Sequence, residues 1–461
     1  MGIFLKKIIR IFIVLTMAPA IHHAAAREPA VRIDGQTLTL KVDGIPLRWI
    51  LKEISSQGII VRVDPEIDPL VTASFDNRDL QEAFRQVVKG YNHALVWKKG
   101  DNGDPVLSKI VIYNQGGMGR ASPIKSPSAL TIEKNPITGA IYVKNKILVR
   151  FKKPISAGQI QAVAKSLNAS IVLVHEGQGL YEITLPDDTN TADAMAVLEK
   201  ENRVETVEPD YAYRSPDLVR YGDTGWDTQQ HSPHGHPDGS APVAVLDSGL
   251  NPDFLSRDLN QASFNALSPE DTISDASGHG TQMALIASGK IKPMGAESDS
   301  FSNPVVSVRA FDENGYTSNS VLIRGIDFAV EKGAKVLSLS WGSETDSRFL
   351  EMAVAYAGSK GMVVVAAAGN SPTGKPVYPA AYDAVISVSA LAPDGSAWDR
   401  SNFGEFVDTA APGFARLPIG HNGDPGTYAG TSISTAYIAG RLAAYLRDNP
   451  DAVINIRKRK P

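Results

Sequence analysis

Three side chains in the second half of this 461-residue chain, Asp247, His279 and Ser432, have the types needed for nucleophilic catalysis. A serine hydroxyl is a weak nucleophile at neutral pH unless an adjacent base takes its proton as it attacks. The imidazole of His279 would be that base, and it would then protonate the leaving amine. The carboxylate of Asp247 would hold the imidazole in the required tautomer and stabilise the imidazolium. The predicted chemistry is hydrolysis by a serine nucleophile.

The local sequence around each of these residues suits that chemistry. Asp247 directly follows the apolar run 243–246, and Gly249 permits a tight exit from a strand. His279 and Ser432 each begin a segment with the apolar spacing of a helix. A helix N-terminus carries partial positive charge, which favours a developing alkoxide or oxyanion.

Strand-like and helix-like segments alternate from Ala241 onward. The apolar strand runs are 243–246, 305–311, 336–341, 362–368 and 385–388, with helical stripes over 320–332 and 349–356. This alternation predicts an α/β fold, a parallel sheet with covering helices. Reactive groups collect at the C-terminal edge of such a sheet, which is where Asp247 would lie.

Three sequence blocks resemble the signature blocks of the subtilase family and occur in the order Asp, His, Ser that this family uses. They are Asp247-Ser248-Gly249, Ser277-Gly278-His279-Gly280-Thr281 and Gly430-Thr431-Ser432. Their spacing, 279 − 247 = 32 and 432 − 279 = 153 residues, leaves room for the strands and helices of one domain. Further matches are Ala366-Ala367-Ala368-Gly369-Asn370, Tyr378-Pro379-Ala380, Ser401-Asn402-Phe403-Gly404 and Ala411-Pro412-Gly413, so the resemblance covers about residues 241 to 447. The resemblance implies a secreted serine endopeptidase that is made as a self-processing precursor.

The same resemblance implies how a peptide substrate would be held. The side-chain amide of Asn370 and the backbone N–H of Ser432 would bind the oxyanion. An extended substrate would pair with two backbone edges, Ser340-Trp341-Gly342 and Gly315-Tyr316-Thr317. The main pocket would be lined by Trp341, Gly342, Ala367, Ala368 and Gly369. Whether Trp341 points into this pocket or packs below it stays open.

Two positions depart from the family pattern, because Ala436 stands where proline is usual and Tyr437 where histidine is usual. We expect these departures to alter the helix entry rather than the chemistry. The reaction requires no cofactor. Family members often bind calcium, but no contiguous carboxylate loop assigns a calcium site, and no metal ligands are assigned. Near histidines at 231, 234 and 236 lie in turn-rich sequence, which favours a surface loop over a metal site.

Two small α+β modules are predicted upstream of the catalytic segment. Residues 33–114 resemble the short N-terminal domain of secretins and TonB-dependent receptors, and an unrelated docking domain fits them equally. Residues 141–213 have a βαββαβ pattern, with Thr191 expected to cap the second helix. Together with the closing sequence Val207-Glu208-Pro209-Asp210-Tyr211, this pattern resembles the inhibitory propeptide of subtilases. The remaining segments are predicted as linkers at 115–140 and 214–240, a peptidase domain at 241–450 and a basic tail at 451–461.

Several sequence features bear on the compartment and the partners. Residues 1–26 have a signal-peptide layout, with basic residues, a short apolar stretch and small residues before Arg27, which predicts export to the periplasm or the medium. The absence of cysteine excludes disulfides and thiolate metal sites. A net charge of −4 makes nucleic acid an unfavourable partner. The expected partners are protein or peptide substrates, the chain's own propeptide, and an envelope protein bound through residues 33–114.

Two functions are compatible with the sequence. The first is an endopeptidase that cleaves itself between the second module and Ala241. The alternative is an envelope-docking or sensory protein that uses a protease-like scaffold. Retention of the three catalytic residue types together with Asn370 favours the endopeptidase.

Overall fold

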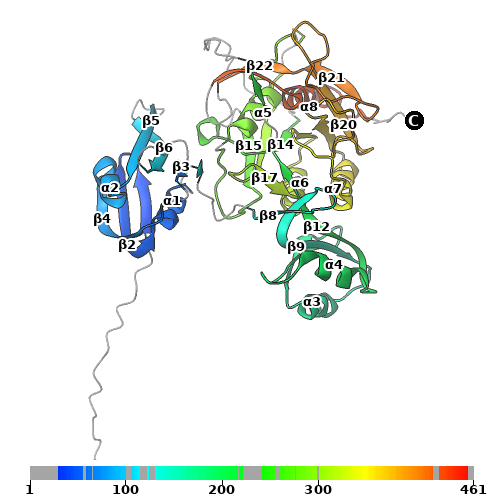
Figure 1. Ribbon diagram of the computed structural model, residues 1–461. Helices are drawn as coiled ribbons and strands as arrows, with labels where there is room; N and C mark the ends of the chain where they lie inside the picture. Colours follow the sequence, from blue (N-terminus) through cyan, green and yellow to red (C-terminus); the bar gives the residue numbers. More distant parts are fainter. Residues whose placement is uncertain are drawn as a thin grey trace, which may run out of the picture.

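The structure is a computed structural model (Figure 1). It describes residues 30–55, 59–64, 66–99, 105–114, 122–123, 130–215, 218–221, 241–255, 259–275, 277–297, 301–418 and 425–454. The predicted signal peptide, the three near histidines and most of the predicted basic tail lie outside these residues.

A seven-stranded parallel sheet forms the centre of the C-terminal domain. Its order is β15-β16-β14-β18-β19-β20-β21, and all six neighbouring pairs are parallel. The strands are β14 (Val243–Asp247), β15 (Asn260–Asn265), β16 (Val305–Arg309), β18 (Val336–Leu339), β19 (Val363–Ala367), β20 (Val385–Leu391) and β21 (Thr409–Pro412). The predicted α/β fold is confirmed.

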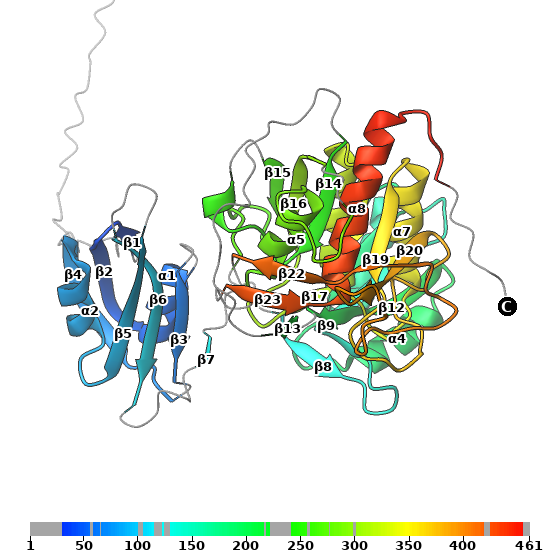
Figure 2. The same cartoon turned by 90° about the horizontal axis from the view of Figure 1, so that it is seen from above.

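Helices cover both faces of this sheet (Figure 2). They are α5 (His279–Ala287) and α8 (Thr431–Asp448) on one face, and α6 (Asn319–Glu331) and α7 (Arg348–Ser359) on the other. Along β14, Val243 and Val245 pack with α5 and α8, whereas Ala244 and Leu246 pack with α6 and α7. Successive side chains of a strand point to opposite faces, so a strand covered on both sides is apolar throughout. This burial fixes the end of β14, and with it Asp247, inside the protein.

The module before the C-terminal domain has the predicted βαββαβ order. Its elements are β9 (Ile141–Phe151), α3 (Ala157–Ser166), β10 (Ser170–His175), β11 (Leu180–Thr184), α4 (Thr191–Glu199) and β12 (Val204–Arg214). The strand order is β10-β11-β9-β12, and β12 then pairs with β17 (Tyr316–Ser318) of the C-terminal domain. The two domains thus share one sheet.

Two details of this module differ from the prediction. Strand β8 (Ile132–Lys134) pairs antiparallel with β9, so the module begins inside the range predicted as a linker, 115–140. A three-residue strand in turn-rich sequence has too little periodicity to detect. The cap of α4 is Asn190, whose Oδ1 accepts from the N–H groups of Ala192 and Asp193, and Thr191 is the first helical residue.

Residues 30–113 form a separate α+β lobe, as predicted (Figure 1). One sheet contains β1 (Ala30–Asp34), β2 (Thr37–Pro46) and β4 (Leu70–Asp79). The other contains β3 (Ile60–Val63), β5 (Asn92–Lys99) and β6 (Pro105–Tyr113), with β7 (Ser122–Pro123) at its edge. Helices α1 (Leu47–Ser55) and α2 (Leu80–Val87) contribute to their common core.

A small antiparallel sheet lies beside α8. It joins β13 (Val219–Arg220), β23 (Gly426–Ala429) and β22 (Phe414–Leu417) in the order β13-β23-β22 (Figure 2). Strand β13 falls in the segment predicted as a linker, 214–240, because two residues carry no detectable strand pattern. Among the described residues, none of the helices combines the length and the apolar character that crossing a membrane requires.

Candidate active site

Asp247 occupies the C-terminal end of β14, as the sequence predicted. The chain then turns at Gly249, where φ is +122°. A Cβ at Gly249 would lie 2.0 Å from the carbonyl oxygen of Ser274, so this turn requires glycine. The close approach of the turn at Gly249 to the segment at Ser274 brings the first turn of α5 next to Asp247.

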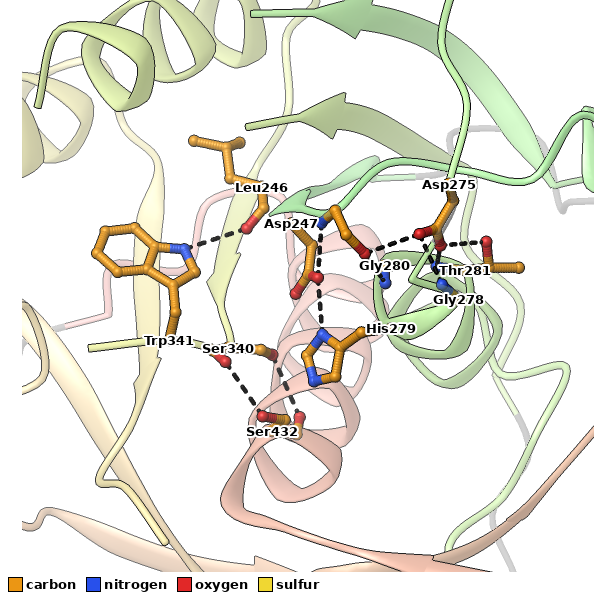
Figure 3. Close-up of polar contacts among 11 residues, drawn as sticks. Leu246, Asp247, Asp275, Gly278, His279, Gly280, Thr281, Ser340, Trp341 and Ser432 are labelled. Carbon is orange, nitrogen blue, oxygen red and sulfur yellow. Dashed lines mark hydrogen bonds and ion pairs between the residues drawn. The ribbon is translucent and has the colours of Figure 1, made fainter. Parts of the chain in front are cut away.

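His279 is the first residue of α5, and its Nδ1 lies 2.7 Å from Oδ1 of Asp247 (Figure 3). The imidazole is fully buried and the carboxylate is nearly so. Oδ1 of Asp247 also accepts the N–H of Ser248 at 2.7 Å, which fixes the carboxylate. A carboxylate only accepts hydrogen bonds, so Nδ1 carries the proton and Nε2 is left as the basic nitrogen. Figure 3 shows Nε2 on the side of the ring that faces Ser432.

Ser432 lies in the first turn of α8, and its Oγ donates to the main-chain carbonyl of Ser340 at 3.1 Å. The hydroxyl of Ser340 in turn donates to the carbonyl of Ser432 at 3.3 Å. The structure therefore brings together all three predicted catalytic side chains from β14, α5 and α8.

Asp275 is a site residue that the sequence motifs do not reveal. Its Oδ1 accepts from the hydroxyl of Ser248 at 2.9 Å and from the N–H of Gly278 at 2.8 Å. Its Oδ2 accepts from the N–H and the hydroxyl of Thr281, at 2.8 and 2.6 Å. The hydroxyl of Ser248 also accepts the N–H of Gly280 at 2.8 Å. Backbone groups on both sides of His279 are thus tied to the turn that follows Asp247 (Figure 3).

No local sequence signal identifies Asp275. It lies three residues before Gly278, the N-cap of α5, and so outside the cap and first-turn positions where aspartate is enriched. Its bond to Ser248 joins residues 27 positions apart, which no local pattern shows.

Asn370 follows β19 and lies beside Thr431, the residue before Ser432. Its Oδ1 accepts from both the N–H and the hydroxyl of Thr431, each at 2.9 Å. The hydroxyl of Thr431 also accepts the N–H of Gly369 at 3.2 Å. The amide oxygen of Asn370 is thus held by the residue that precedes Ser432. Ala368 is buried in the same loop, where its N–H bonds the carbonyl of Val388.

The predicted substrate edge at Gly315 and Tyr316 is occupied by the chain itself. Strand β12 runs antiparallel to β17, with Tyr213 opposite Thr317 and Arg214 opposite Tyr316. The N–H of Ser215 then donates to the carbonyl of Gly315 at 2.7 Å.

Trp341 is buried beside the edge at β17, under the ring of Tyr213. Its side chain is 1% exposed, and its Nε1 donates to the carbonyl of Leu246 at 3.1 Å. The ring of Tyr213 lies against it, with a centroid distance of 5.5 Å. Gly342 faces Val377, whose Cγ1 would be 2.6 Å from an added Cβ. The ring of Tyr213 therefore covers Trp341.

Two further carboxylates join β12 to the C-terminal domain. Glu208 accepts from the hydroxyl of Ser347 at 2.8 Å and from the N–H of Arg348 at 2.9 Å, at the start of α7. Asp210 is fully buried and accepts from the hydroxyl and the N–H of Ser320, at 2.7 and 3.0 Å, at the start of α6. A carboxylate at a helix N-terminus satisfies free N–H groups and matches the helix dipole.

A metal site requires several ligand side chains close together. The residues that the structure describes contain no cluster of three or more histidine and carboxylate side chains that could hold a metal ion. A calcium site therefore stays unassigned.

Comparison with known proteins agrees with this geometry. The family model described as the subtilase family matches residues 239–457, and the model of the fervidolysin N-terminal prodomain matches residues 131–210. Thermitase from Thermoactinomyces vulgaris is 34% identical over 220 residues, which cover 47% of this chain and 78% of thermitase. A thermostable alkaline protease from Halalkalibacterium halodurans is 29% identical over 339 residues, which cover 73% of this chain and 91% of that protein.

A solved structure shares the fold. The crystal structure of fervidolysin from Fervidobacterium pennivorans, described as a keratinolytic enzyme related to subtilisin, matches with a TM-score of 0.53 and 22% identity. The match covers 70% of this chain and 57% of fervidolysin, so this chain spans little more than half of that relative.

We predict that replacing Asp275 with alanine lowers kcat for peptide hydrolysis by roughly a hundredfold while KM changes little, because a misplaced imidazole affects the reaction and not the substrate edges. Steady-state kinetics of the processed protein measure both values. Replacement of the exposed Asp271 is the matched control. An Asp275→Ala variant that folds and keeps its kcat would show that this carboxylate does not position His279.

Proposed function

The chain belongs to the subtilase family and is a serine endopeptidase with a prodomain, and from that premise we propose that Asp247, His279 and Ser432 are its catalytic triad. The observation that carries this assignment is the buried contact of 2.7 Å between Asp247 and His279, beside the first turn of α8.

In the proposed mechanism, Oγ of Ser432 attacks the carbonyl carbon of the scissile peptide bond as Nε2 of His279 takes its proton. The tetrahedral intermediate collapses when His279 gives that proton to the leaving amine, and the C–N bond breaks. Water then attacks the acyl-enzyme with His279 again as the base, which frees the acid product and restores the hydroxyl. Asp247 orients the imidazole and stabilises the imidazolium.

The oxyanion of each tetrahedral intermediate is assigned to the amide nitrogen of Asn370 and the backbone N–H of Ser432. The bonds from Thr431 to Oδ1 support this role, because they fix the amide before substrate arrives. Donors fixed in advance need no reorganisation when charge develops, which is why such groups accelerate acyl transfer.

We assign residues 130–215 as the inhibitory prodomain. Strand β12 covers the edge at β17, the ring of Tyr213 covers Trp341, and the hydroxyl of Tyr213 donates to Oδ1 of Asn319 at 2.8 Å. The Glu208 and Asp210 bonds to two helix N-termini add fixed points of attachment. A substrate would have to displace this strand, so the precursor is held inactive towards other proteins.

Export and targeting complete the proposal. The N-terminal layout supports export, and a minor extracellular protease of Bacillus subtilis is among the relatives, at 34% identity over 220 residues. Residues 30–113 lie outside both matching family models. For them we propose a targeting role through an envelope protein.

The test of the proposed function compares the purified full-length chain with its Ser432→Ala variant by intact mass over time. We expect the unmodified chain to be cut between Arg214 and Ala241 and the variant to stay whole. The matched control is Ser434→Ala, because Ser434 is also buried in α8 and its hydroxyl donates to the carbonyl of Ala411. Processing of the Ser432→Ala chain at the same rate would refute the triad.

A second prediction concerns the pH dependence of prodomain docking. Nε2 of His175 in the prodomain lies 3.1 Å from Oδ1 of Asp327 in α6. Burial raises the pKa of Asp327 to about 7, and burial also raises the pKa values of Asp210 and Glu208. A carboxyl group whose pKa is raised in the docked state favours docking when it is protonated. This contribution is complete below the ordinary carboxyl pKa of about 4 and is lost as pH rises through about 7.

We therefore expect the cleaved prodomain to dissociate more readily at pH 8 than at pH 5, and the change to be smaller in Asp327→Asn. Burial lowers the pKa of His175. Protonation of this histidine therefore weakens docking as pH falls below the ordinary pKa of histidine, which acts in the opposite direction. Gel filtration of the processed, serine-inactivated protein measures the prodomain retained at each pH. Tighter retention at pH 8, or an unchanged pH dependence in Asp327→Asn, would contradict the prediction.

A further inference from the structure

The chain occupies a second backbone edge beside Ser432, in addition to the edge at β17. Strand β13 runs antiparallel to β23, with Val219 opposite Ala429 and Arg220 opposite Tyr428. The N–H of Tyr221 then donates to the carbonyl of Thr427 at 2.8 Å. Strand β23 ends at Ala429, three residues before Ser432. The catalytic helix therefore begins directly after this occupied edge.

The chain covers the β17 edge first and the β23 edge a few residues later. Ser215 pairs with Gly315 on the β17 side, and Leu218 is buried against Gly430 on the β23 side. An added Cβ at Gly430 would be 2.6 Å from Cδ2 of Leu218, which shows how closely the segment approaches the loop before Ser432. The β17 edge thus holds residues up to Ser215 and the β23 edge holds residues from Leu218 onward, so a cut between these two residues would leave one segment on each edge.

Side chains hold the second segment as well. The ring of Tyr221 lies on Phe414 with a centroid distance of 5.2 Å, and its hydroxyl accepts from Nε1 of Trp398 at 3.2 Å. Trp398 and Phe414 are 4% and 8% exposed, and we call this pair the aromatic shelf. Tyr221 itself is 48% exposed, so it covers the shelf without being enclosed by it. Such an occupant can leave without disturbing the core.

We propose that the aromatic shelf beside the β23 edge selects an aromatic side chain on the leaving-group side of a peptide substrate, and that residues 218–221 compete for this surface after processing. The inference rests on the proposed endopeptidase function. A segment tethered to its own site has an effective concentration of about a millimolar, so it competes even when each contact is weak. The processed enzyme remains partly closed to long substrates until this segment leaves the β23 edge.

The test uses two fluorogenic substrates with the same sequence before the cleaved bond. One carries a coumarin amide directly at that bond, and the other is an internally quenched peptide that extends several residues beyond it. Loss of an aromatic contact predicts that Tyr221→Ala raises kcat/KM for the extended peptide by about three- to tenfold, mainly through KM. The coumarin substrate does not reach the β23 edge, so its kcat/KM should not change.

Two variants make the comparison specific. Tyr221→Phe keeps the ring and loses the bond to Trp398, so we expect a smaller gain. Tyr445→Ala removes a half-exposed tyrosine elsewhere and should change neither substrate. An equal gain for both substrates, no gain for the extended one, or a processed chain that begins beyond Tyr221 by N-terminal sequencing would overturn the competition. Failure of the unmodified enzyme to cleave either substrate would instead refute the endopeptidase function, and this inference with it.

Discussion

The buried contact between the Asp247 carboxylate and the His279 imidazole is the interaction on which the rest of the structure depends. A carboxylate removed from water is unfavourable unless fixed donors surround it, and here Nδ1 of His279 and the N–H of Ser248 supply them. Bringing these groups together requires a strand end and a helix start to meet. The seven-stranded sheet provides the strand end, and the close approach at Gly249 lets the helix start reach it.

Asp275 fixes the position of the turn after Asp247 relative to the first turn of α5. Its two oxygens take four hydrogen bonds from Ser248, Gly278 and Thr281, so the turn after Asp247 and the first turn of α5 move as one unit. The prodomain uses the same kind of interaction between domains. Glu208 and Asp210 place carboxylates at the N-termini of two helices, where they accept hydrogen bonds from backbone N–H groups. The proposed triad and the proposed inhibition thus share one feature, acidic side chains that satisfy backbone N–H groups.

Much of this arrangement could be predicted from local sequence. The apolar run before Asp247, the helical segments that begin at His279 and Ser432, and the βαββαβ pattern all depend on periodicity within a few residues, and the structure confirms them. Contacts between distant segments could not be predicted in this way. The pairing of β12 with β17 joins residues about a hundred positions apart, and the burial of Trp341 depends on Tyr213 from the other domain. Strands β8 and β13 were missed for the same reason, because their partners and not their sequences make them strands.

The most direct test of the central claim is to react the processed protein with a fluorophosphonate and to locate the labelled residue by tandem mass spectrometry. The account predicts one label, on Ser432, and its loss in a folded His279→Ala variant, because the hydroxyl is a nucleophile only beside its base. A label on another serine, or undiminished labelling of Ser432 without His279, would contradict it.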